Sequence, residues 1–114
     1  MPGLFKKVDC YVVSVPDLEQ GISFYSGKLD HRVAWKRETA AGLTMPGSEA
    51  EIVLSTELPS HTGLVVDDAR RAYLRLLSHG CRSLREPYRI EIGWCAMVID
   101  PFGNELVFLD ILPV

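Results

Sequence analysis

Hydrophobic and polar positions alternate along residues 8–15 in the pattern of a half-buried strand, and apolar residues then recur at helical spacing over residues 18–29. The same order returns 51 residues later, with alternation over residues 61–66 and helical spacing over residues 69–78. A pattern repeated at this period indicates two copies of one supersecondary unit. We therefore analyse the two halves of the chain against each other.

Each copy continues with three further extended runs. Ala40-Ala41-Gly42 and Pro46-Gly47-Ser48 are the turn signals in the first copy, and Asp100-Pro101-Phe102-Gly103-Asn104 is a turn in the second. The runs are residues 32–38, 42–45 and 51–56 in the first copy, and residues 82–88, 93–99 and 105–111 in the second. The order of elements in each copy is therefore β-α-β-β-β.

Residues near both expected helices have the chemistry of helix ends. Asp17, with Gln20 three residues later, forms an N-terminal capping pattern, and Asp67 or Asp68 is expected to cap the second helix. Gly80 follows the second helix as a plausible residue of left-handed conformation. The helix boundaries are thus predicted at both ends.

Neither copy buries a sheet face alone, so we expect the two to pair. The fold class predicted is α+β, with two paired β-α-β-β-β modules, residues 8–57 and 61–113, in one domain that spans residues 1–114. The strand faces away from the helices mix small, apolar and polar residues. Such faces suit curved mixed sheets that form a cleft.

The composition narrows the function classes. A chain of 114 residues with 47% hydrophobic and 24% charged residues is typical of one soluble globular domain. A net charge of −3 gives no basic field for nucleic acid, and no apolar run is long enough to span a membrane. The odd number of cysteines, three, and the absence of a signal-peptide pattern predict a cytoplasmic protein without a disulfide framework.

Two sequence segments resemble motifs of a known family. Residues 15–25, Val-Pro-Asp-Leu-Glu-Gln-Gly-Ile-Ser-Phe-Tyr, and the turn at residues 100–104, Asp-Pro-Phe-Gly-Asn, resemble the vicinal-oxygen-chelate superfamily, which contains glyoxalase I, bleomycin-resistance proteins and extradiol dioxygenases. Together with the doubled element order, the resemblance covers nearly the whole chain. It implies a cleft function and, in many members, a homodimer.

The metalloenzymes of this family bind a divalent ion through one residue of each opening strand and a carboxylate of each closing strand. Carried over by position, the resemblance gives Cys10, His61, Val53 and Val107. Two valines cannot donate to a metal, and a thiol with an imidazole leaves too few ligands. The resemblance therefore favours the metal-free, bleomycin-resistance-like branch, with no cofactor.

An alternative metal site uses the carboxylates two residues earlier on the closing strands. Glu51 and Glu105 lie on the same faces as the valines, about 6–7 Å along the strand. A register change or bulge would then give a site of Cys10, His61, Glu51 and Glu105 for a divalent metal ion.

Ligand contacts are expected from Cys10, Trp35, Val53, His61, Trp94 and Val107. Trp35 and Trp94 would stack on a planar ligand if they faced the cleft, and would otherwise pack in the core. His61 either binds a ligand or is a half-exposed polar residue, and Cys10 has the alternative of a small buried hydrophobe.

Three functions follow. The first is metal-free small-molecule binding, with drug sequestration as its bleomycin-resistance-like form. The second is a metal-dependent lyase, isomerase or transferase of the glyoxalase type with a remodelled site. The third is a structural or regulatory dimer module with no small ligand.

Overall fold

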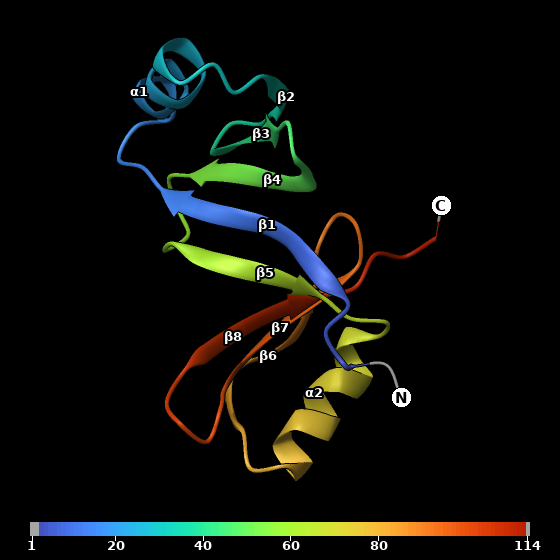
Figure 1. Cartoon of the computed structure of the whole chain (residues 1–114). Coiled ribbons are helices and arrows are strands. Elements are labelled where there is room, and N and C mark those ends of the chain that lie inside the picture. Colours follow the sequence, from blue (N-terminus) through green and yellow to red (C-terminus); the bar gives the residue numbers. More distant parts are fainter. Residues whose placement is uncertain (1–2, 114) are drawn as a thin grey trace. The chain divides into compact units, whose positions relative to one another are not determined.

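The computed structural model describes residues 3–113, which form two compact units (Figure 1). Residues 9–62 form one, here called the N-terminal unit. Residues 3–8 and 63–113 form the other, the C-terminal unit. Each unit contains a helical segment and four strands, so the predicted β-α-β-β-β order is confirmed in both copies.

The sheet of the N-terminal unit has the strand order β2-β3-β4-β1. Its strands are β1 (Lys7–Ser14), β2 (Val33–Lys36), β3 (Ala40–Met45) and β4 (Ser48–Ser55). β1 and β4 are parallel, with Cys10 opposite Glu51, and the other pairs are antiparallel. A helical crossover is what parallel neighbours require, and the helical segment between β1 and β2 supplies it.

That helical segment consists of α1 (Leu18–Ile22) followed directly by a π-helical stretch, η1 (Ser23–Lys28). Asp17 caps α1 as predicted, because its Oδ2 accepts a hydrogen bond of 2.9 Å from the Gln20 backbone N–H. The segment ends at Asp30, whose φ of 67° lies in the left-handed region that aspartate tolerates better than most residues.

One turn prediction in this unit is wrong. Ala40-Ala41-Gly42 is part of β3, and the chain reverses just before it, where the Arg37 N–H donates to the Ala40 carbonyl at 2.8 Å. The reason is tertiary, because Gly42 leaves room on the sheet for the side chain of Trp35 on the neighbouring strand.

The sheet of the C-terminal unit has the order β5-β8-β7-β6, with β5 and β8 parallel and Gly63 opposite Val107. Its elements are β5 (His61–Val65), α2 (Ala69–Ser78), β6 (Arg82–Arg89), β7 (Trp94–Ile99) and β8 (Glu105–Leu109). Asp68 caps α2, and Gly80 has a φ of 96°, as predicted. The sheets of both units are therefore mixed, as expected.

Each unit buries the sheet face that its own helix covers. In the N-terminal unit this core consists of Val15, Leu18, Ala41, Leu43, Ile52 and Leu54. In the C-terminal unit it consists of Val66, Ala69, Ala72, Tyr73, Ala96, Val98 and Phe108. The alternation of the strands therefore leaves the opposite faces, at Val53 and Val107, for other contacts.

A buried carboxylate joins three elements of the C-terminal unit. Asp110 is 4% exposed and directly follows β8. Its Oδ2 accepts from the Ala69 N–H at 2.7 Å, and its Oδ1 accepts from the Trp94 N–H at 2.8 Å. The carboxylate therefore ties the end of β8 to the first residues of α2 and β7.

Among the described residues, no helix has the length and apolar character needed to cross a membrane.

Candidate functional site

The N-terminal unit carries a tryptophan laid against its sheet, on the face away from α1. Trp35 lies opposite Gly42, and a Cβ atom placed on Gly42 would be 2.0 Å from the indole Nε1. The pyrrole part of the indole therefore lies over the Gly42 backbone. The indole N–H donates to Glu51 Oε1 at 2.8 Å, so a glycine beneath and a carboxylate at its edge fix the ring.

The rest of this face is formed by short side chains. Cys10 lies opposite Glu51 on β1, Thr44 lies opposite Glu51 on β3, and Val53 lies opposite both Val12 and Gly42. Cys10, Glu51 and Val53 are all half-buried. Three of the predicted ligand contacts, Cys10, Trp35 and Val53, thus share one face of the sheet.

His61 is oriented by its own chain. Its Nδ1 lies 2.7 Å from the Pro59 carbonyl oxygen, which can only accept, so Nδ1 carries the proton in this arrangement. In the neutral ring, Nε2 is then the nitrogen with a free lone pair. The geometry is compatible with His61 accepting a hydrogen bond from a ligand.

In the C-terminal unit, Val107 belongs to an apolar cluster on the sheet face away from α2. The cluster contains Cys95, Val107 and Leu109, which are 6–8% exposed, with Tyr88, Ile90 and Met97 packed against them. The position where the family's metalloenzymes have a carboxylate is therefore surrounded by aliphatic and aromatic side chains.

Two titratable groups of this cluster stay protonated at neutral pH. Burial, together with a hydrogen bond to Cys95, raises the pKa of Tyr88 to about 12. Burial also raises the pKa of Cys95. The Arg85 guanidinium carbon lies 3.5 Å from the centroid of the Tyr88 ring. A thiol with a raised pKa carries little thiolate, so this arrangement does not activate Cys95 as a nucleophile.

Trp94 lies on the other side of its sheet from this cluster. It packs against the core between the sheet and α2, and the Arg70 guanidinium carbon lies 4.4 Å from its ring centroid. This placement favours the packing alternative for Trp94, whereas Trp35 faces away from its helix.

The side chains do not fit the family's metal site. Val53 and Val107 have no donor atom, and in the alternative set Glu51 is engaged by Trp35 while Glu105 is exposed at the start of β8. Within residues 3–113, no three His, Cys, Asp or Glu side chains gather in an arrangement for an ion. We therefore derive no chemical step through a metal.

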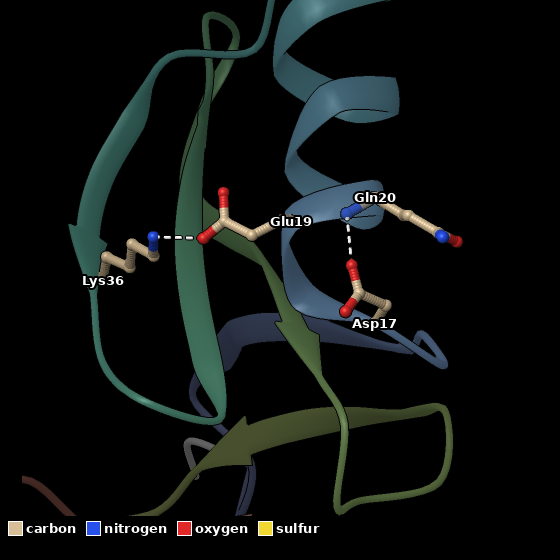
Figure 2. A network of polar contacts seen from close by, with 4 residues as sticks. All are labelled: Asp17, Glu19, Gln20 and Lys36. Atoms are coloured by element: carbon tan, nitrogen blue, oxygen red, sulfur yellow. Dashed lines mark hydrogen bonds and ion pairs between the residues drawn. The ribbon is translucent and has the colours of Figure 1, made fainter.

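Two surface hollows lie elsewhere. One of about 510 Å³ borders the start of α1 and the end of β2, where Lys36 forms an ion pair with Glu19 while Asp17 caps the helix (Figure 2). The other, of about 320 Å³, borders the N-terminal segment and α2, where Lys6 pairs with Asp67 at 3.0 Å. In both hollows opposite charges already pair locally, so neither competes with Trp35 as a candidate site.

Sequence reasoning missed Gly42 and the cluster residues Tyr88, Cys95 and Arg85. Gly42 carried a usable signal, since a glycine within a strand often marks the close approach of another group. No such signal marks Tyr88 and Cys95. They come together only through the register between β6 and β7, which places them opposite each other.

The fold is shared with several solved structures. Methylmalonyl-CoA epimerase from Mycobacterium tuberculosis superposes with a TM-score of 0.81 at 20% identity, over 99% of this chain and 93% of that one. Homoprotocatechuate 2,3-dioxygenase from B. fuscum superposes with a TM-score of 0.72 at 20% identity, over 96% of this chain and 33% of that one. A Legionella pneumophila structure described as an NAD-dependent benzaldehyde dehydrogenase superposes with a TM-score of 0.75 at 14% identity, over 90% of this chain and 98% of that one. At these identities the likeness shows the fold alone.

A search of curated proteins gives no match. The sequence profile of the Glyoxalase/Bleomycin resistance protein/Dioxygenase superfamily matches residues 7–108, which is most of the chain. The doubled element order, the mixed strand pairing and this match agree, and the chain belongs to the glyoxalase/bleomycin resistance protein/dioxygenase superfamily.

Proposed function

We propose that the protein binds a small organic molecule on the sheet faces away from its helices and does so without a resident metal ion. The observation that carries the proposal is the surroundings of Val53 and Val107. The first lies on a face of short side chains beside Trp35, and the second lies inside an apolar cluster. The half-buried face at Val53 can bury apolar ligand area, which is the main source of small-molecule affinity, whereas the buried cluster at Val107 places no metal donor at that position.

Each of these faces also carries a polar pair. Glu51 accepts from the Trp35 indole, and Tyr88 is hydrogen-bonded to Cys95. A few placed polar groups on an apolar surface orient a ligand and select it. The metal-free, drug-sequestering branch of the superfamily is the part of the family that this chemistry matches best.

The test has two parts. After dialysis against a chelator we expect no stoichiometric metal by elemental analysis, and His61→Ala and Glu105→Ala should leave the metal content unchanged. In the chelated protein, at least one compound from a library of metabolite-sized organic molecules should raise the unfolding midpoint. At ten times its Kd a ligand stabilises the folded state by about 1.4 kcal/mol.

A matched pair of variants locates the bound compound. Val53→Phe fills the face away from α1 and should weaken binding. Tyr11→Phe is the control, because Tyr11 is half exposed and, opposite Ile52, on the other face of the same sheet. Tight, stoichiometric metal whose loss abolishes ligand binding would overturn the proposal in favour of a metal-dependent lyase, isomerase or transferase.

The oligomeric state and location belong to the same proposal. The resemblance to the superfamily leads us to propose a homodimer in the cytoplasm, with modules that pair to form the ligand cleft. Sedimentation at several protein concentrations tests the dimer, and a monomer at all of them would contradict it.

A further inference from the structure

Trp35 is a stacking surface that exists before any ligand binds. Its indole is fixed from below by the Gly42 backbone and at its edge by the hydrogen bond from Nε1 to Glu51. Fixing the ring in advance removes the entropy cost of ordering it when a ligand arrives. The face of the ring away from Gly42 is the one that a flat molecule would contact.

Glu51 gives this surface a chemical preference. Its carboxylate is half-buried and can only accept hydrogen bonds, with room for about four across its two oxygens, whereas the indole N–H supplies one. A partly desolvated carboxylate is stabilised by further donors and by positive charge. An anionic group placed beside it would be repelled.

The neighbouring charge is a cation on an exposed side chain. The Arg37 guanidinium carbon lies 5.7 Å from the Trp35 centroid, near the outer limit for a cation–π contact, and Arg37 is exposed. The ring thus already attracts a flat, positively charged, N–H-bearing group. A cation–π contact at this distance from an exposed side chain contributes little to stability.

We propose, building on the small-molecule function above, that this site selects flat nitrogen heteroaromatic ligands that present an N–H donor edge, neutral or cationic. The ring of the ligand stacks on Trp35, and its N–H groups donate to Glu51. Stacking supplies the affinity, and the carboxylate supplies the selection between ligands of equal size.

The experiment uses the full chain with Trp94→Phe, which leaves Trp35 as the single tryptophan, since the sequence contains two. Quenching of tryptophan fluorescence then reports contact with Trp35 directly. The probe is aminobenzimidazole with its amino group beside the ring nitrogens. Methylbenzimidazole has the same size with fewer donors, and naphthalenesulfonate is flat and anionic. We expect saturable quenching that is strongest for aminobenzimidazole and weakest for naphthalenesulfonate.

Glu51→Gln is the decisive variant, because its amide oxygen can still accept from the indole N–H while the charge is lost. It should weaken aminobenzimidazole binding by roughly tenfold, the effect of losing a charge-assisted hydrogen bond. Glu105→Gln, at the equivalent position of the second copy, removes the same charge from an exposed site and should leave the affinity within about twofold.

A second pair of variants displaces the ring without removing it. Gly42→Ala places a methyl group in the volume that the indole occupies and should abolish the quenching. Gly47→Ala is the control, since no atom lies within 4 Å of a Cβ at that position. Far-ultraviolet circular dichroism shows that each variant has kept its fold.

The outcomes separate the two proposals. If naphthalenesulfonate quenches as strongly as aminobenzimidazole, or Glu51→Gln binds like the parent, the ligand class is wrong. If library compounds stabilise the chelated protein without changing Trp35 fluorescence, the ligand class again fails but the small-molecule function stands. If no compound in either assay binds, the function itself fails.

Discussion

The buried carboxylate of Asp110 offers a test of how the C-terminal unit is held together. Replacing Asp110 with alanine leaves the N–H groups of Ala69 and Trp94 without their acceptor. Each buried donor left unsatisfied costs about 1–3 kcal/mol. Because the Ala69 bond is buried and the Trp94 bond is partly buried, we expect a total loss of about 3–5 kcal/mol.

Such a loss is a large part of the total stability of a domain of this size, which is about 5–15 kcal/mol. Asp110→Asn provides a graded second variant, since its amide oxygen can replace one acceptor while its NH₂ group faces the other N–H. We expect it to cost about half as much, near 2 kcal/mol. This variant keeps the test informative if Asp110→Ala does not fold.

The measurement is equilibrium unfolding in urea at neutral pH, followed by circular dichroism and by fluorescence to check that both probes give one transition. Asp68→Ala is the control, because Asp68 caps the same helix through the Arg71 N–H at 3.1 Å but from the surface. An ordinary cap of this kind contributes about 1 kcal/mol. If Asp110→Ala costs no more than Asp68→Ala, the reasoning from burial is refuted.

Two further predictions concern the backbone and the titration of the C-terminal cluster. Gly80→Ala should lower the free energy of unfolding by about 1 kcal/mol, because Gly80 has a φ of 96°. Gly47→Ala is the control and should be neutral or slightly stabilising, because φ at Gly47 is not positive. Equal effects of the two variants on urea unfolding would contradict this prediction. Tyr88, whose pKa is raised to about 12 by burial, should contribute a component near pH 12 to an absorbance titration of the folded protein, and Tyr88→Phe should remove that component. Since the folded pKa is raised above the unfolded value of about 10, the stability that Tyr88 contributes is complete below pH 10 and is lost as the pH rises toward 12.

Much of the fold could be predicted from local patterns. The helix at Ala69–Ser78 was predicted at its observed boundaries because a capping aspartate, an apolar stripe and a terminal glycine all act within a few residues of each other. The strands were placed within a few residues at their ends. Leu64 and Phe108 both belong to the core beneath α2, as the alternation of side chains along any strand requires.

The error at Ala40-Ala41-Gly42 shows the limit of such patterns. Glycine serves both turns and close contacts, and the sequence near Gly42 does not distinguish the two. Only the pairing of β2 with β3 shows that the side chain resting on this glycine is Trp35. The register between β3 and β4 then brings Glu51 within reach of the indole, although Trp35 and Glu51 are 16 positions apart.

The sequence by itself determined the repeated element order and the helix ends, and it has valines, Val53 and Val107, at the positions that its resemblance to the superfamily assigns to metal-binding carboxylates. The tertiary structure decided which face each tryptophan occupies, and it placed Glu51 at the edge of one ring and Asp110 beneath α2. The physical reason is the distance along the chain over which each kind of interaction acts. Caps and periodicity depend on residues a few positions apart, whereas the surroundings of a side chain depend on strand register, which is settled only when distant segments pack.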